Sequence, residues 1–360
     1  MTDGVRLYAG TQQGLLVWRE RNGHWDQVCH EFRDGVIDGL VGSRADPERV
    51  YLSSASDGVY KTEDGGSHWT RIFEGDVRAL TLDPNDESVL YVGTEPVHLY
   101  RSEDGGAHWE EVAGLLNLPE DVRKKWWTPY PPATGHVRYV FVHADDPNTL
   151  YICLEHGGVH RSFDRGETWE DVSGGIDYLD MHMVQSLPHS TSRYYCTSAR
   201  GFFTSEDPGD GWARAEEGLN RSYSHDFIFL PPTREGETPP MLVSTADGSP
   251  GFWKREERGA RAALFRSLDA GQSWQRVTRG LPDDMDHMVW GMALHPHDPD
   301  AVFAAIGATQ RGSTFDTYSD VTPALSHVPG QVLLSHDRGE SWEPLPLQLP
   351  ADRLLWAAPD

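Results

Sequence analysis

One eight-residue motif, S/T-x-D-x-G-x-x-W, occurs six times along the 360-residue chain. Its copies begin at Thr62, Ser102, Ser162, Ser205, Ser267 and Ser335, and residues 22–25 keep only its end. The aspartate of such a motif can accept N–H bonds within a tight turn, and the glycine permits backbone conformations that other residues resist. The repeat therefore predicts a series of similar β-hairpins, each with a tryptophan ring packed beneath its turn.

Four short apolar segments accompany the motif, and they are clearest around residues 77–112. We assign strands to residues 77–82, 89–93, 98–102 and 109–112, with the motif between the third and the fourth. The same order recurs from residues 137, 183, 226 and 288. A four-stranded unit that repeats at regular spacing is typical of a β-propeller blade.

The two ends of the chain complement each other. Residues 6–10 read as the second strand of a blade without a first, and residues 353–357 read as a first strand with nothing after it. Pairing these two segments would close the ring and remove its exposed sheet edges. The sequence thus predicts an all-β, seven-bladed β-propeller of four-stranded antiparallel blades, formed as a single domain by residues 1–360 and closed by its N- and C-terminal strands.

The motif is similar to the Asp-box, or BNR, repeat, and the chain resembles Asp-box β-propellers over almost its whole length. This family includes sialidases, sortilin-type domains, xyloglucanases and the photosystem II assembly factor. The resemblance implies the fold but selects no single function, because these relatives are enzymes, receptors and scaffolds. Xyloglucanases use two such propellers with a cleft between them, and one propeller cannot form that cleft within itself.

Composition narrows the classes of partner. The formal net charge of −25 opposes binding to nucleic-acid phosphates. No run of 18 apolar residues suggests a membrane span. Three widely spaced cysteines form no disulfide framework, and the opening residues lack the basic and apolar regions of a secretory signal. We therefore expect a cytoplasmic protein that binds neither nucleic acid nor membrane and acts on a small molecule; its oligomeric state is left open.

Three long segments, residues 113–135, 246–262 and 308–330, are expected on one face of the ring, where the innermost strands begin. Loops of this length are usually functional or disordered, and neutral variation of tolerant loops is the alternative for each of them. Their aromatic residues are Trp126, Trp127, Tyr130, Phe252, Trp253, Phe315 and Tyr318. We select Trp126, Trp127 and Trp253, together with Trp290 of the last blade, as candidate substrate-binding residues, although Trp126 and Trp127 could equally anchor their loop.

Four consecutive blades place a histidine directly before the innermost strand: His136, His182, His225 and His287. These positions are expected to point toward the axis of the ring. Imidazoles that converge in this way can bind a divalent transition metal such as Fe, Zn or Cu. Such a metal would support hydrolytic, lyase or oxygenase chemistry. Ordinary hydrogen-bonded histidines are the alternative.

Carboxylates and arginines are expected on the same face. Glu155, Asp226 and Asp286 are candidate catalytic groups, as general acid or base or as hydrogen-bond acceptors for metal-bound imidazoles. Arg78 and Arg138 occupy matching positions in adjacent blades and could clamp an anionic substrate, or form salt bridges between blades.

Three functions follow from these observations. The leading hypothesis is a metal-dependent enzyme that acts on a small polar or anionic substrate at the axial funnel. The first alternative is a metal-free, glycosidase-like propeller in which carboxylates perform the chemistry and tryptophans stack on sugars. The second alternative is a protein-binding assembly scaffold.

Overall fold

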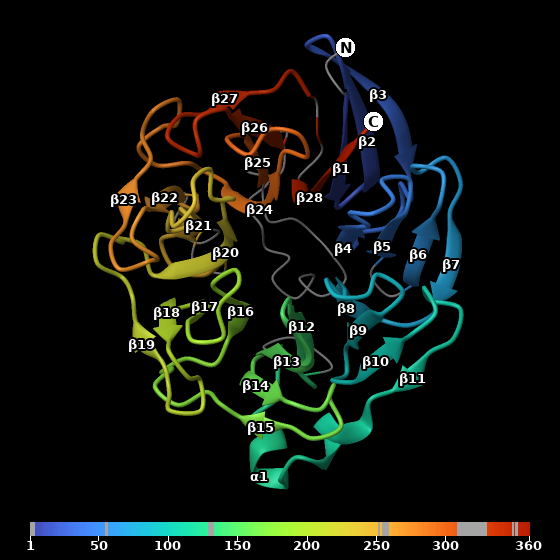
Figure 1. The fold of residues 1–360 in the computed structure, drawn as a ribbon, viewed down its shortest axis with the longest axis vertical. Helices are drawn as coiled ribbons and strands as arrows, with labels where there is room; N and C mark the ends of the chain where they lie inside the picture. The colour runs from blue at the N-terminus through green and yellow to red at the C-terminus, as the bar shows by residue number, and fades with distance from the viewer. Residues whose placement is uncertain are drawn as a thin grey trace.

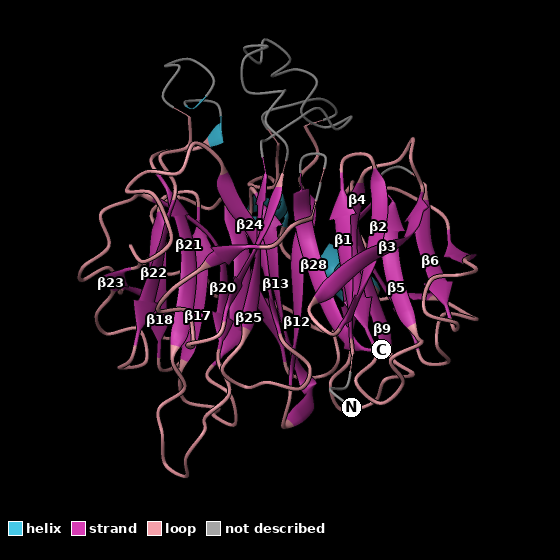
Figure 2. Ribbon diagram, turned by 90° about the horizontal axis from the view of Figure 1, so that it is seen from above, coloured by secondary structure: helices cyan, strands magenta, loops and turns pink. Residues whose placement is uncertain are grey.

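The computed structural model describes residues 4–54, 57–128, 133–250, 253, 259–307, 330–347, 349 and 352–360, the segment 352–354 by its backbone alone. Seven four-stranded antiparallel sheets stand around a common axis (Figure 1). Seen from the side, their strands run between the two faces of the ring (Figure 2). The predicted all-β, seven-bladed propeller is confirmed.

Each blade is numbered along the chain, and its strands are given from the axis outward. Blade 1 contains β28 (Asp352–Pro359), β1 (Val5–Thr11), β2 (Gly14–Arg21) and β3 (His24–Glu31); blade 2 contains β4 (Ile37–Gly42), β5 (Val50–Ser54), β6 (Gly58–Thr62) and β7 (Thr70–Phe73). Blade 3 contains β8 (Val77–Leu82), β9 (Leu90–Thr94), β10 (Leu99–Ser102) and β11 (Glu110–Glu111); blade 4 contains β12 (His136–His143), β13 (Asp146–Glu155), β14 (Gly158–Ser162) and β15 (Glu170–Asp171).

The remaining three blades repeat this order. Blade 5 contains β16 (Met181–Ser186), β17 (Tyr194–Ser198), β18 (Gly201–Ser205) and β19 (Ala213–Arg214); blade 6 contains β20 (Tyr223–Phe229), β21 (Met241–Ala246), β22 (Ala263–Ser267) and β23 (Gln275–Arg276); blade 7 contains β24 (Met288–Leu294), β25 (Val302–Gly307), β26 (Gln331–Ser335) and β27 (Glu343–Pro344). Two short helices, η1 (Ala113–Asn117) and α1 (Glu120–Arg123), interrupt the connection between blades 3 and 4.

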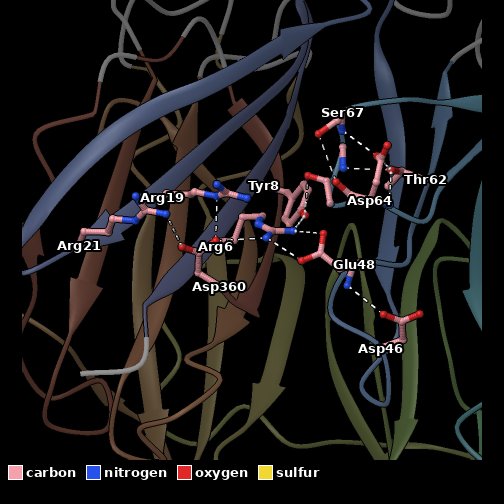
Figure 3. Close-up of polar contacts among 12 residues, drawn as sticks. Arg6, Tyr8, Arg19, Arg21, Asp46, Glu48, Thr62, Asp64, Ser67 and Asp360 are labelled. Carbon is pink, nitrogen blue, oxygen red and sulfur yellow. Dashed lines mark hydrogen bonds and ion pairs between the residues drawn. The ribbon is translucent and has the colours of Figure 1, made fainter. Parts of the chain in front are cut away.

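The ring closes through blade 1. Strand β28 pairs with β1 in antiparallel register, as predicted from the two chain ends. The buried Arg6 of β1 strengthens this closure, because its guanidinium contacts Asp360 after β28 and also Glu48 of blade 2 (Figure 3). Its neighbour Tyr8 donates a hydrogen bond to the Gly65 carbonyl, also in blade 2. One buried cation thereby joins the N-terminal strand, the C-terminus and the adjacent blade.

The repeated motif forms the same turn in five of its six copies. In the first copy, the Thr62 hydroxyl donates to Asp64 and accepts the N–H of Gly66. The indole N–H of Trp69 donates to the Gly66 carbonyl. The copy at Ser205 differs, because its hydroxyl donates instead to the Gly211 carbonyl. These turns lie on the face opposite the starts of the innermost strands.

We call the face where the innermost strands begin the upper face. It carries the connections between blades and the turns between the second and third strands. The predicted aromatic residues Tyr130, Phe252, Phe315 and Tyr318 lie outside the described residues. No helix in the described part of the chain is long and apolar enough to cross a membrane.

Candidate functional site

Charged side chains from neighbouring blades form a connected network at the upper end of the axis. At one side of it, Arg78 of β8 is buried among three carboxylates. Its guanidinium lies 2.9 Å from Asp76, 3.4 Å from Asp38 and 3.0 Å from Glu95. An arginine satisfied by so many carboxylates fixes the junction of blades 2 and 3, so it forms the predicted salt-bridge alternative to a substrate clamp.

His136 links this network to blade 4. Its Nδ1 lies 3.6 Å from Glu95 Oε2, and its Nε2 lies 3.3 Å from Glu155 Oε2. Glu155 is the last residue of β13, and its backbone pairs with His136 across the sheet. The strand register therefore places this imidazole between two carboxylates.

Arg138 continues the network toward blade 6. Its Nε lies 3.9 Å from Glu155 Oε2, and its Nη2 donates to His225 Nε2 at 2.9 Å. Because a guanidinium only donates, the accepting Nε2 of His225 carries no proton. His225 is therefore held in its neutral form.

The neighbouring imidazole is neutral as well. His182 Nδ1 donates to the Ser224 carbonyl at 2.6 Å, and its Nε2 lies 3.6 Å from Asp180 Oδ1. Burial lowers the pKa of His182 to about 4, and the positive charge of Arg138 adds to this effect. Its Nε2 is thus an acceptor that faces the Asp180 carboxyl.

Glu155 and Asp180 have opposite electrostatic environments. Burial raises the pKa of Glu155, but the nearby His136 and Arg138 outweigh burial and hold that pKa well below its usual range. For Asp180, burial raises the pKa well above its usual value, and the negative charge of Glu155 raises it further. Glu155 is consequently ionised while Asp180 stays protonated. Two carboxyl groups whose pKa values are shifted apart by their environments are typical of acid–base sites.

Both carboxyl groups remain accessible from the upper face. The exposed fraction is 15% for the Glu155 side chain and 14% for that of Asp180. Asp180 Oδ1 is buried and accepts no hydrogen bond from any described residue. We call Glu95, His136, Arg138, Glu155, Asp180, His182 and His225 the axial cluster.

An exposed tryptophan stands beside the axial cluster. The indole of Trp127 is stacked on the His156 ring, with a centroid distance of 4.5 Å and an interplanar angle of 9°. Two backbone hydrogen bonds join the same two residues, and His156 also lies 3.8 Å from Asp180. Trp127 is 45% exposed, so one face of a firmly held ring is open to solvent.

Of the other predicted tryptophans, Trp253 and Trp290 are buried and Trp126 is partly buried. Trp126 packs edge-on against His160 and the core of blades 3 and 4, which anchors its loop. Trp290 is 5% exposed, donates to the Gly307 carbonyl and lies edge-on to His225. Trp253 is 4% exposed and packs against Tyr223 and Trp290.

The prediction of a metal-dependent enzyme is wrong. No group of three or more histidine, cysteine or acidic residues within the described part of the chain could hold a metal ion. Of the four histidines, His136 lies between two carboxylates. The rings of His182 and His225 are 5.0 Å apart. One nitrogen of His182 donates to the Ser224 carbonyl, and one nitrogen of His225 accepts from Arg138. No contact between described residues joins His287 to the other three. The expected transition-metal cofactor rested on this histidine set and has no other basis.

Two of the predicted catalytic carboxylates lie apart from the pair. Asp226 is buried between blades 6 and 7, where it accepts the Met292 N–H at 2.8 Å. Burial raises its pKa to about 7. Asp286 is exposed, and its backbone carbonyl accepts a hydrogen bond from the Ala260 N–H. The structure thus brings Glu155, Arg138, His136, His182 and His225 together, without Asp226 or Asp286.

Sequence reasoning missed Glu95, and it considered Asp180 as a hydrogen-bond acceptor or as a general acid or base without selecting it as a catalytic residue. Glu95 follows β9 as Glu155 ends β13, and both positions lie next to the start of an innermost strand. An alignment of the second strands of each blade, in addition to the first strands, would have identified it.

Comparison with known proteins finds similarity to a probable xyloglucanase. No family model matches the chain. A probable oligoxyloglucan-reducing end-specific xyloglucanase from Neosartorya fischeri is 25% identical over 304 residues, which are 78% of this chain and 34% of that protein. The chain therefore spans about a third of the length of this relative.

Solved structures share the fold at lower identity. The GH74 enzyme of Niastella koreensis matches with a TM-score of 0.63 and 16% identity, over 94% of this chain and 46% of that chain. The GH74 xyloglucanase of Xanthomonas campestris matches with a TM-score of 0.58 and 15% identity, over 98% of this chain and 67% of that chain. A structure of YCF48 bound to D1 peptide matches with a TM-score of 0.53 and 16% identity, over 86% of this chain and 80% of that chain. The chain thus resembles both GH74 propellers and YCF48 in fold.

Proposed function

We propose that this protein is a carbohydrate-active propeller that hydrolyses glycosidic bonds without a metal. The proposal rests on the pair of Glu155 and Asp180, whose surroundings shift their pKa values in opposite directions, and on the exposed Trp127 beside them. Glycoside hydrolysis typically requires one carboxylic acid and one carboxylate at the scissile bond. The relationship to a probable xyloglucanase supports the same chemistry.

Each residue of the site has a distinct role. The protonated Asp180 donates a proton to the glycosidic oxygen as the bond breaks, so the sugar leaves as an alcohol. The ionised Glu155 takes a proton from the water that attacks the anomeric carbon through an oxocarbenium-like transition state, so a new hydroxyl forms on the sugar. Exchange of protons with solvent then restores the protonated Asp180 and the ionised Glu155. His136 and Arg138 keep Glu155 ionised and are positioning residues.

Trp127 binds the substrate. A flat apolar ring favours the C–H-rich face of a pyranose, and stacking on His156 fixes the ring so that little side-chain freedom is lost on binding. The stacking partner of Trp127, His156, follows Glu155 in the chain and lies 3.8 Å from Asp180, so we expect a sugar on the indole to reach both carboxyls.

Hydrolysis assays on point variants test the proposal. We expect the wild-type chain to release reducing ends from a soluble cell-wall polysaccharide or its oligosaccharides, with xyloglucan as the first substrate. Glu155→Gln and Asp180→Asn should each lower kcat by roughly 100-fold or more. Glu110→Gln, on the outer strand β11, is the matched control and should retain full activity.

Two results would overturn the proposal. One is a folded wild-type chain that hydrolyses none of a broad panel of polysaccharides and oligosaccharides. The other is full activity in either carboxyl variant, with a melting temperature equal to that of the control.

A further inference from the structure

A second polar feature of the upper face lies between blades 5 and 6. It is a cavity of about 540 Å³, within the size range of small-ligand sites. Tyr178 lines this cavity, and its ring lies edge-on, at 5.4 Å, to His156, on which Trp127 is stacked. A ligand in the cavity would therefore extend toward Trp127 and the two carboxyls.

The lining of this cavity is cationic, although the chain as a whole is strongly acidic. Three arginines, Arg200, Arg214 and Arg261, line it, against a single carboxylate, Asp247. The net charge of −25 makes such a local excess of positive charge unusual for this surface.

Two of the three arginines are neutralised by acidic neighbours. Arg214 forms a bidentate pair with Asp177 at 2.8 and 3.0 Å. Arg261 lies 3.1 Å from both Asp247 and Asp284. These two guanidinium groups are parts of the cavity wall.

Arg200 differs from them. Its guanidinium lies over the Tyr178 ring, 4.1 Å from the ring centroid, and no carboxylate within the described residues pairs with it. The backbone holds the same residue in place, because its N–H donates to Ser198 and its carbonyl accepts from Arg214. A positioned guanidinium without an anion offers its fork of N–H donors to a ligand.

Neutral polar groups complete the lining. Ser222 and Ser249 border the cavity, and the Asp247 carboxylate can accept hydrogen bonds from hydroxyl groups. A surface with hydroxyl partners and one available guanidinium matches a sugar that carries a carboxylate.

From this arrangement we infer that the cavity is a specificity subsite for an acidic sugar, whose carboxylate pairs with Arg200. This inference deepens the proposed function, because it names uronic-acid-containing oligosaccharides as the substrate class. The sugar carboxylate forms two charge-assisted hydrogen bonds with the guanidinium, and Ser222, Ser249 and Asp247 bind the ring hydroxyls.

Binding measurements on the inactive Glu155→Gln chain test the inference independently of hydrolysis. Calorimetry compares a uronic-acid-containing oligosaccharide with the same oligosaccharide after its carboxyl has been reduced to an alcohol. We expect the acidic ligand to bind about tenfold or more tightly, and the difference to shrink at high salt.

The arginine dependence is tested with a matched pair of variants. In the Glu155→Gln background, Arg200→Gln should abolish the preference for the acidic ligand. Arg234→Gln, an exposed arginine in the connection between β20 and β21, should preserve it. Equal affinity for the two ligands, or an acid preference that survives Arg200→Gln, would overturn the inference.

The two proposals fail in different experiments. Hydrolysis of neutral substrates with no preference for acidic ligands would refute the subsite and leave the glycosidase intact. Arg200-dependent binding of the acidic ligand without hydrolysis of any substrate would do the reverse.

Discussion

Arg6 Nη2 lies 3.1 Å from Asp360 Oδ1, so a single ion pair joins the first strand of the protein to its last residue. The same guanidinium forms a two-pronged contact with Glu48 at 2.8 and 3.0 Å (Figure 3). Arg6 is 2% exposed, and burial strengthens the electrostatic attraction within the cluster. Ring closure therefore combines the pairing of β28 and β1 with a buried charge cluster.

Replacement of this arginine should weaken the whole ring. Arg6→Met removes the buried cation from the partly exposed Glu48 and from Asp360, which keeps Arg19 at 2.8 Å, and is expected to lower the free energy of unfolding by about 2 kcal/mol. Urea denaturation followed by circular dichroism measures the change. Arg21→Met removes an exposed arginine that contacts the same Asp360 at 3.6 Å, and it should cost less than about 1 kcal/mol. Equal losses in the two variants would mean that burial of Arg6 adds nothing.

A buried histidine predicts destabilisation in mild acid. His160 is fully buried, neither ring nitrogen has a hydrogen-bond partner among the described residues, and burial lowers its pKa to about 4. The unfolded chain binds a proton below about pH 6.5, whereas the folded chain does so only near pH 4. Stability should therefore fall by up to about 3 kcal/mol as the pH decreases between these values.

His160→Phe isolates this contribution, because phenylalanine keeps an aromatic ring but cannot titrate. Unfolding free energies of both proteins at pH 7.5, 6, 5 and 4 provide the comparison. As the pH falls, the unfolding free energy of the variant should rise relative to that of the wild type. A difference in unfolding free energy that does not change with pH would contradict the lowered pKa of His160.

Asp226 has the opposite dependence on pH. Its pKa in the folded protein is about 7, so the folded state retains a proton that the unfolded state releases above about pH 4. Its contribution to stability is full below pH 4 and is lost as the pH rises toward 7. Asp226→Asn mimics the protonated acid and can still accept the Met292 N–H. We expect the variant to exceed the wild type by about 2 kcal/mol or more at pH 8 and to lose this advantage at pH 4, as measured by urea denaturation.

The exposed Trp127 should contribute to substrate binding rather than to bond cleavage. Trp127→Ala is expected to raise KM for an oligosaccharide substrate roughly threefold to tenfold, with a smaller change in kcat. Steady-state kinetics separates the two parameters. Phe163, an aromatic residue that is 59% exposed on the opposite face, provides the control Phe163→Ala, which should leave both parameters unchanged. A kcat effect without a KM effect would argue against sugar stacking on Trp127.

Most of the fold could be predicted from sequence because its determinants are local and repeated. The innermost strand predicted over residues 77–82 coincides with β8 (Val77–Leu82). The outermost strand of the same blade, predicted over residues 109–112, is assigned only over Glu110–Glu111, although the Val112 N–H still donates to the Leu99 carbonyl. Trp109 before it donates to the Ile72 and Gly106 carbonyls. The two short helices after it carry no repeat and were not predicted.

The candidate site could be predicted only in its location. Equivalent positions in successive blades drew attention to His136, His182 and His225, and the structure joins them to one network through Glu155, Arg138 and the neighbouring rings of His182 and His225. The orientation of each ring depends on groups contributed by other blades, such as the Ser224 carbonyl for His182 and the Arg138 guanidinium for His225. Such contacts across blades leave no periodic signal in the sequence. The opposite pKa shifts of Glu155 and Asp180 could not be predicted for the same reason, because burial and neighbouring charges determine them.

The protonation states of Glu155 and Asp180 test the central claim most directly, because the proposed acid–base chemistry depends on them. The measurement is a ¹³C NMR titration of the side-chain carboxyls, with Glu155→Gln and Asp180→Asn identifying the two signals. We predict that Glu155 is already ionised at pH 4, while Asp180 remains protonated well above that pH. Two carboxyls that titrate together near pH 4 would contradict the account.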